Sequence, residues 1–186
     1  MGSTANSANG KVAIVTGTAS GMGTELAGDL IKQGWNVGCI DVNESTGQKL
    51  AAELGERAFF VKCDVAKYDD QATAFSEVWN KWGRLDAVLM NAGIVDRSSI
   101  YILNHRGSKE IPPAPDISTT NVDYLGVVYG TQLAIHFMRQ NSAPGGQIVA
   151  TASIAAVHPH ASYPEYCGAK AAVSVERYLI SSKNES

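Results

Sequence analysis

Short apolar runs alternate with longer amphipathic stretches along most of this sequence. The run at 11–17 is rich in β-branched residues and ends in glycine, and the stretch at 21–34 then spaces its apolar side chains at helical period up to Gly34. The alternation continues with strands predicted at 35–41, 58–64, 85–93 and 145–153, and with helices predicted at 43–55, 69–83, about 117–141 and about 163–182. Strands that are apolar on both faces and separated by helices predict a doubly wound α/β fold with a parallel sheet.

Two stretches depart from this alternation. Residues 1–10 are small and polar, and we predict that they form a disordered leader ahead of a single domain at 11–186. Residues 94–116 contain three prolines and mixed charges without a sustained period, which predicts an irregular excursion at the carboxyl end of the strand at 85–93. Because ligands bind at that edge of open α/β sheets, the excursion either lines a substrate site or is a plain connecting loop.

The bulk composition argues against several classes of protein. The net charge is -3 and the chain has no basic stripe, so a nucleic-acid partner is not expected. The longest apolar runs have the length of strands, so we expect no membrane-spanning segment and a cytoplasmic protein. Cys39 and Cys63 lie in apolar runs and are interpreted as small core residues, and no metal site is expected.

A glycine-rich stretch, TGTASGMG at 16–23, joins the first predicted strand to the first predicted helix. Gly17 permits a tight turn, Gly21 lets the backbone approach a pyrophosphate, and Gly23 allows the helix to pack closely on the strand. The amide groups at the start of the helix then face the negative charge of the phosphates. A strand before the glycines and a helix after them predict a dinucleotide-binding turn.

Asp41 ends the second predicted strand, at the position where a dinucleotide's adenosine ribose is expected. Its carboxylate can accept hydrogen bonds from both ribose hydroxyls, and it would repel a 2′-phosphate. No Lys or Arg lies in the glycine-rich stretch or directly follows Asp41. The sequence therefore favours NAD over NADP, and the alternative is a surface aspartate that caps the next helix.

The stretch SYPEYCGAKAA at 162–172 carries residues suited to acid–base catalysis. Ser162, Pro164 and Glu165 predict a helix start with a capping box. Tyr166 and Lys170 then lie four residues apart on one helical face, where the ammonium favours the phenolate form of the tyrosine. Tyr166 is therefore a candidate general base or acid, although a Tyr–Lys pair on an arbitrary helix is usually a solvated face.

Three neighbouring side chains are weaker candidates. Tyr163 could share the helical face of Tyr166, but we interpret it as a packing or pocket-rim residue. His158 and His160 lie in a proline-containing loop without a third metal ligand nearby, so we interpret them as surface or pocket-lining residues.

The spacing T-G-x-x-x-G-x-G resembles that of the short-chain dehydrogenase/reductase family, and further family motifs follow in order between 11 and about 178. They are Asp64-Val65 after the third predicted strand, Asn91-Ala92-Gly93 after the fourth, Asn121 in the long helix, Ser153 after the fifth strand, and Tyr166 with Lys170. Ser153 precedes Tyr166 by the family's usual spacing. Met90 is a departure, because the family usually has a second Asn there. The resemblance implies a Rossmann-type fold.

The resemblance also implies a role for each matching residue. Tyr166 would be the general acid/base, Ser153 would donate a hydrogen bond to the substrate oxygen, and Lys170 would hold the nicotinamide ribose. Asn121 would position a water that links Lys170 to solvent. The implied catalytic residues are Asn121, Ser153, Tyr166 and Lys170. The implied NAD-binding residues are Gly17, Ser20, Gly21, Met22, Gly23, Asp41, Val42, Asp64, Val65, Asn91, Ala92, Gly93, Tyr166 and Lys170.

The function implied by this resemblance is that of an NAD(H)-dependent oxidoreductase that interconverts a secondary alcohol and a ketone. The Y-C-x-x-K motif and the Asp at the end of the second strand resemble more narrowly the NAD-dependent 15-hydroxyprostaglandin dehydrogenase group. The family commonly self-associates through the helix at about 163–182, which implies a homo-oligomer. Family members continue beyond the point where this chain ends, so we expect the last strands and the helical lid to be missing. The alternatives are a truncated, catalytically poor dinucleotide-binding homologue and a non-redox isomerase.

Overall fold

The computed structural model describes residues 10–98 and 100–181, so the predicted leader lies outside the described residues except for Gly10. The contacts of the described chain divide it into two compact units. The first unit contains residues 10–92 and Gly126–Thr151, and the second contains Gly93–Leu125 and the residues from Ala152 onward. The residues predicted to bind the dinucleotide and those predicted to catalyse therefore fall mainly in different units.

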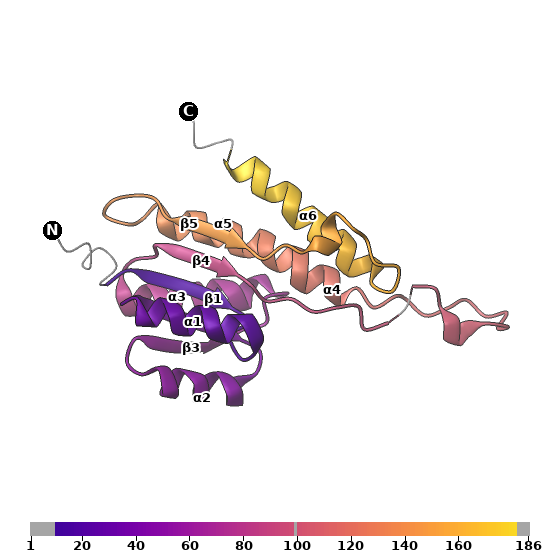
Figure 1. The fold of residues 1–186 in the computed structure, drawn as a ribbon, viewed down its shortest axis with the longest axis horizontal. Helices are drawn as coiled ribbons and strands as arrows, with labels where there is room; N and C mark the ends of the chain where they lie inside the picture. The colour runs from indigo at the N-terminus through magenta and orange to yellow at the C-terminus, as the bar shows by residue number, and fades with distance from the viewer. Residues whose placement is uncertain (1–9, 99, 182–186) are drawn as a thin grey trace. The chain divides into compact units, whose positions relative to one another are not determined.

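Within the described residues, the first unit contains a five-stranded parallel sheet in the order β3-β2-β1-β4-β5. Its elements are β1 (Val12–Thr16), α1 (Gly21–Lys32), β2 (Asn36–Asp41), α2 (Glu44–Leu54), β3 (Ala58–Lys62), α3 (Tyr68–Trp82), β4 (Ala87–Met90), α5 (Gly126–Met138) and β5 (Gln147–Ala150). Helices α1 and α2 contact each other, and so do α3 and α5 (Figure 1). Because parallel strands are joined by right-handed crossovers, these two pairs cover opposite faces of the sheet. The predicted doubly wound α/β fold is confirmed.

The core of this unit is built on the central strand, β1, whose five residues are all buried. Val15 belongs to a buried cluster with Ala27 of α1 and Cys39 of β2. The rings of Phe75 in α3 and Phe137 in α5 stack with their centroids 6.1 Å apart. Strand β5 lies at one edge of the sheet. Among the described residues, no helix is both long and apolar enough to cross a bilayer.

Cys39 and Cys63 are core residues, as the sequence predicted. Their exposed fractions are 0% and 1%, and both are free thiols. Burial raises the pKa of each thiol to about 12, because the thiolate is poorly solvated in the core. Both side chains therefore stay protonated near neutral pH.

The second unit contains short elements and one long helix. Its elements are η1 (Leu103–His105), α4 (Ser118–Thr120), η2 (Asn121–Leu125), η3 (Ile154–Ala156) and α6 (Pro164–Ser181). Helix α6 contacts α4, η2 and η3, so it organises this unit. Segment η2 is a π-helical turn, and π-turns occur frequently at functional sites. The stretch predicted as one helix at 117–141 is therefore not uniform.

Candidate functional site

The glycine-rich stretch forms the turn between β1 and α1. Gly17 and Gly21 have φ angles of 74° and 54°, in the left-handed region that favours glycine. A Cβ on Gly17 would lie 2.8 Å from the Ala92 Cα, and a Cβ on Gly23 would lie 2.0 Å from the Gly17 carbonyl oxygen. A larger residue at either position would displace backbone. The turn therefore has the close helix-to-strand packing that the sequence predicted for Gly23.

The start of α1 presents polar groups suited to an anion. Ser20 is the N-cap in an extended conformation, and its hydroxyl makes no capping hydrogen bond. The first turn of α1 contains no acidic residue, and Met22 in that turn is 64% exposed. Because the amides at a helix start carry partial positive charge, this end of α1 suits a phosphate group.

Asp41 faces the same turn from the end of β2. Its Oδ2 accepts a hydrogen bond from the Ala19 amide at 2.9 Å, and its Oδ1 accepts one from the Asn43 amide at 2.9 Å. The cap of α2 is Asn43, whose side chain accepts from the Thr46 amide. The alternative that Asp41 caps the next helix is therefore wrong.

A pocket of about 410 Å³ opens near the ends of β2 and β3. Its lining residues are Val42, Lys62, Asp64, Lys67, Asp70 and Thr73. The Asp64 carboxylate is held in place, because Oδ1 accepts from the Ala66 amide at 3.1 Å and Oδ2 lies 3.6 Å from the Lys67 Nζ. Val65, the next residue, is buried. The pocket thus contains two of the predicted NAD-binding residues, Val42 and Asp64.

Asn91 and Ala92 follow β4 and are tied to the end of β1. The Thr16 hydroxyl oxygen accepts from the amides of both residues at 3.0 Å. The Asn91 side chain donates to the Thr16 carbonyl at 3.2 Å and accepts from the Thr151 hydroxyl at 3.4 Å. Thr16 therefore joins the ends of β1 and β4, and Asn91 extends these contacts to Thr151 after β5. Thr16 was not among the predicted site residues, and its place directly before Gly17 was the available signal.

In the second unit, Tyr166 and Lys170 lie on one face of α6, as their spacing predicted. The Lys170 Nζ lies 5.6 Å from the centroid of the Tyr166 ring. Lys170 is only 3% exposed. A charge on the ammonium is therefore poorly screened by water at the phenol group.

The Lys170 ammonium forms an ion pair with Asp123, with Nζ and Oδ2 3.1 Å apart. Asp123 is fully buried, and its Oδ1 accepts from the Ile94 amide at 2.7 Å. Burial raises the pKa of the Asp123 carboxyl above its ordinary value, while the Ile94 amide and the Lys170 ammonium oppose that shift. The lysine that the sequence assigned to catalysis is thus paired with a buried carboxylate.

Asp123 was not among the predicted catalytic residues. The predicted residue in this segment was Asn121, which is the first residue of η2 and is partly buried. The signal in the sequence was an acidic residue between the apolar Val122 and the apolar stretch that begins at Leu125. A lone carboxylate in such surroundings usually has a buried partner.

Helix α6 begins at Pro164, and its start is not held by the predicted capping box. The Glu165 carboxylate instead accepts from the Thr120 amide at 3.1 Å and from its hydroxyl at 2.9 Å. The Asp96 carboxylate accepts from the amides of Glu165 at 3.1 Å and Tyr166 at 2.8 Å. The capping-box prediction was wrong because partners distant in sequence take its place. The irregular excursion at 94–116 thus supplies a side chain that holds the start of α6.

Ser153 is the N-cap of η3, and its Oγ accepts from the Ala155 amide at 3.2 Å. A hydroxyl that accepts one hydrogen bond still has its own proton to donate. Because η3 and α6 contact each other, Ser153 and Tyr166 lie on elements that pack together.

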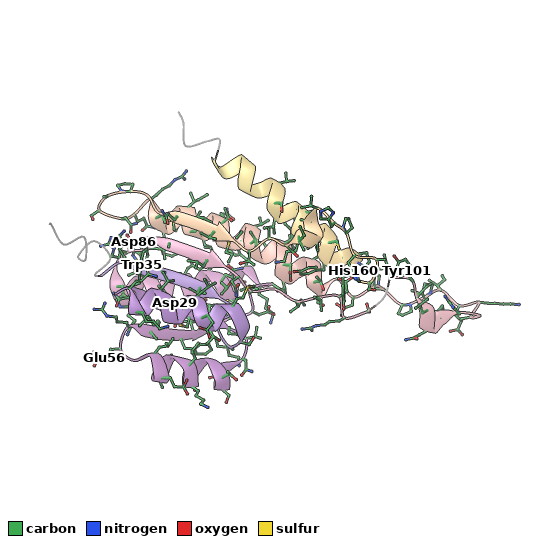
Figure 2. All side chains as sticks on the ribbon, in the orientation of Figure 1. Asp29, Trp35, Glu56, Asp86, Tyr101 and His160 are labelled. Atoms are coloured by element: carbon green, nitrogen blue, oxygen red, sulfur yellow. The ribbon has the colours of Figure 1, made fainter. Side chains whose placement is uncertain are left out.

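The weaker candidates lie near one another in the second unit. The rings of His160 and Tyr163 lie tilted against each other, with their centroids 5.3 Å apart and their planes at 33°, and both residues are exposed. The Tyr101 hydroxyl donates to the Ala161 carbonyl at 3.4 Å, so the 94–116 excursion also reaches this loop (Figure 2). His158 is exposed too, in agreement with a surface position.

Comparison with known proteins places these features in a family. Residues 11–175 match the family model described as short chain dehydrogenase. This chain belongs to the short-chain dehydrogenase family. Short-chain dehydrogenase/reductase prx6 of Penicillium rubens is 51% identical over 175 residues, which cover 88% of this chain and 59% of that protein. The 15-hydroxyprostaglandin dehydrogenase (NAD(+)) of Rattus norvegicus is 34% identical over 168 residues, covering 87% of this chain and 57% of that protein.

A solved structure also has the same fold. The 3-ketoacyl-(acyl-carrier-protein) reductase of Brucella melitensis, complexed with NADH, superposes with a TM-score of 0.81 at 28% identity. The match covers 93% of this chain and 69% of that one. The predicted family and Rossmann-type fold are confirmed. The chain spans less than two thirds of the length of the Penicillium and rat relatives.

Proposed function

We propose that this short-chain dehydrogenase is an NAD(H)-dependent oxidoreductase that interconverts a secondary alcohol and a ketone. The observation that carries the proposal is the buried Lys170 ammonium, 5.6 Å from the centroid of the Tyr166 ring. A positive charge there stabilises the negative charge that develops on the phenol oxygen of Tyr166. Tyr166 would then accept the hydroxyl proton when an alcohol is oxidised and return it when a ketone is reduced.

The features of the first unit fit a dinucleotide with a free ribose 2′-hydroxyl. The start of α1, with the Ser20 hydroxyl, suits the pyrophosphate, and the Asp41 carboxylate suits the two adenosine ribose hydroxyls. The pocket beside Val42 and Asp64 would take the adenine. The nicotinamide, when bound, supplies the hydride acceptor or donor. Two similar proteins support this choice of cofactor: the name of the rat relative includes NAD(+), and the Brucella reductase structure is a complex with NADH.

The remaining roles follow from hydrogen-bonding capacity. The Ser153 hydroxyl would donate its proton to the substrate oxygen and so stabilise the negative charge that develops on it. Lys170 would also hold the nicotinamide ribose. The role of Asn121 and the NAD contacts of Gly93, Val65 and Ala92 stay predictions. Self-association through α6 is part of the proposal, and sedimentation of the purified chain tests it.

The decisive experiment measures NADH formation at 340 nm with a panel of secondary alcohols. Tyr166→Phe should lower turnover by about 10²- to 10⁴-fold and leave NAD affinity nearly unchanged, because it removes one hydroxyl from the proton-transfer step. Tyr163→Phe is the matched control. It removes a phenol hydroxyl from a neighbouring residue whose ring contacts that of His160, and it should keep full turnover.

Each outcome separates the candidate functions. Measurable NAD binding without turnover in any of the three proteins would contradict the oxidoreductase and favour a catalytically poor dinucleotide-binding homologue. Substrate conversion without net formation of NADH would instead indicate an isomerase. Binding measured in parallel with NADP should be weaker than with NAD, since Asp41 repels a 2′-phosphate.

A further inference from the structure

The pocket near the ends of β2 and β3 contains two cations that the proposed function does not use. They are Lys62, the last residue of β3, and Lys67, the N-cap of α3. The dinucleotide proposed to bind here has an uncharged adenosine ribose when it is NAD, and it carries a 2′-phosphate on that ribose when it is NADP. A lysine in this pocket would therefore favour NADP unless its charge is offset.

Each of these lysines is paired with a carboxylate. The Lys67 Nζ lies 3.6 Å from the Asp64 Oδ2. The Lys62 Nζ lies 3.1 Å from Oε2 of Glu44, the first residue of α2. The other oxygen of Glu44, Oε1, accepts a hydrogen bond from the Gln48 Nε2 at 3.3 Å. The Glu44 carboxylate is thus held by its own helix while it binds the lysine on β3.

Lys62 lies beside Asp41, the residue proposed to bind the adenosine ribose. The two residues are register partners on the parallel strands β2 and β3. Register partners on neighbouring strands lie about 5 Å apart and project from the same face of the sheet. The Lys62 side chain is 61% exposed, so turning it towards a phosphate beside Asp41 would disrupt little packing. Its ion pair with Glu44 is the contact that such a movement would have to break.

We propose that Glu44 is a second determinant of cofactor specificity, which acts by keeping Lys62 from binding the 2′-phosphate of NADP. The proposal rests on the NAD site of the proposed function. Asp41 opposes the phosphate by direct repulsion, whereas Glu44 binds the cation that would otherwise attract it. The two carboxylates act through separate contacts. Removing Asp41 alone therefore leaves Lys62 paired and leaves the pocket without a cation for NADP.

The alternative is a surface ion pair that only links α2 to β3. Exposed ion pairs stabilise a fold weakly, and the side chains of Lys62 and Glu44 are 61% and 52% exposed. If the link were the only role of Glu44, its removal would affect the binding of NAD and NADP alike. The ratio of the two affinities therefore distinguishes a specificity determinant from a structural contact.

Isothermal titration calorimetry with NAD and with NADP measures this ratio. The variants are made in an Asp41→Ser background, in which the direct repulsion of the 2′-phosphate is removed. Adding Glu44→Gln should lower the Kd for NADP about tenfold and change the Kd for NAD by less than about twofold. Glutamine keeps the oxygen that accepts from Gln48. Glu53→Gln is the matched control, because it removes the same charge near the other end of α2, where Glu53 pairs with Lys49 at 3.9 Å, and should change neither Kd.

A third substitution identifies the cation. Lys62→Met, added to Asp41→Ser and Glu44→Gln, should abolish the gain in NADP affinity, because methionine keeps an apolar stem and lacks the ammonium. The gain should also shrink in about 1 M salt, where the Debye length falls to about 3 Å. An NADP affinity that is the same with and without Glu44, or that rises independently of Lys62, overturns the proposal. So does a Glu44→Gln variant that binds NAD and does not bind NADP in the Asp41→Ser background.

The binding measurement needs no turnover, so the two proposals fail separately. A chain that binds NAD without forming NADH, and whose NADP affinity rises in Glu44→Gln, would refute the oxidoreductase and support the role of Glu44. A chain whose turnover with NAD depends on Tyr166, but whose NADP affinity does not respond to Glu44→Gln, would support the oxidoreductase and refute the role of Glu44.

Discussion

Gly23 and Gly28 both lie in α1, yet alanine at the two positions should change stability in opposite directions. A Cβ on Gly23 would lie 2.0 Å from the Gly17 carbonyl oxygen and 2.6 Å from its carbonyl carbon. A Cβ on Gly28 would meet the Leu54 Cδ2 at 3.8 Å, which is ordinary van der Waals contact. Since real Cβ atoms essentially never approach another atom within 3.0 Å, Gly23→Ala must push α1 away from the turn by about 1 Å.

The two effects can be compared in free energy of unfolding. Alanine in a helix is favoured over glycine by about 0.5–1 kcal/mol, and Gly28→Ala should gain that amount. Gly23→Ala gains the same contribution, but overpacking costs about 1–3 kcal/mol. The upper end of that range applies, because the obstructing atoms are backbone and cannot rotate away. We therefore expect Gly23→Ala to lose about 2 kcal/mol.

Urea denaturation of the wild-type chain and both variants, followed by far-ultraviolet circular dichroism, measures these differences. Tryptophan fluorescence gives a second probe, to which Trp35 contributes because it packs against the buried cluster of the first unit. Gly23→Ala should also weaken NAD binding, because the turn moves, whereas Gly28→Ala should not. Equal unfolding free energies in the two variants, or a gain in Gly23→Ala, would refute the reasoning.

Two further predictions concern the start of α6 and the core thiols. Asp96→Ala removes the carboxylate that accepts hydrogen bonds from two amides at the start of α6. It should lower the free energy of unfolding, measured by urea denaturation, by about 1–2 kcal/mol. An unchanged free energy would contradict the role given to this carboxylate. Cys39 and Cys63, each with a pKa of about 12, should be alkylated by iodoacetamide at pH 9 at least about 500-fold more slowly in the native chain than in urea, as resolved by peptide mass spectrometry. Similar alkylation rates in the native chain and in urea would show that the two thiols are not buried. Between the unfolded thiol pKa of about 8.5 and the folded pKa of about 12, only the unfolded chain releases these protons. The free energy of unfolding should therefore fall as pH rises through that window.

The sequence predicted the sheet well because strands that are buried consist of apolar, β-branched residues, and such runs are easily recognised. The run that forms β1 is apolar and β-branched, and all five of its residues are buried. The ends of elements were less well predicted. The fourth strand was expected at 85–93, but β4 ends at Met90, because the Asn91 and Ala92 amides bind the Thr16 hydroxyl. Hydrogen bonds to a side chain on another strand cannot be read from local hydrophobicity.

The sequence predicted the parts of the candidate site whose residues are close together in the sequence. It did not predict the contacts between residues that are far apart in the sequence. Tyr166 and Lys170 share a helical face because they are four residues apart, so their relation is visible in the sequence. The contact of Asp96 with the Tyr166 amide joins positions 70 residues apart, within a segment that has no regular period. Asp123 was missed for a different reason. A π-turn changes which side of a helix a residue faces, and no simple pattern announces it.

The π-turn at Asn121–Leu125 also bears on how this region tolerates changes in length. A π-turn holds one residue more than the α-helical turn that it replaces, so a single deletion in η2 would leave an unbroken helix. Each residue of an α-helix rotates the chain by about 100°, so a deletion just before Asp123 would carry its carboxylate away from Lys170 and bring a neighbour to face the ammonium. Homologous chains that differ here by one residue would therefore keep the fold and exchange the partner of the lysine.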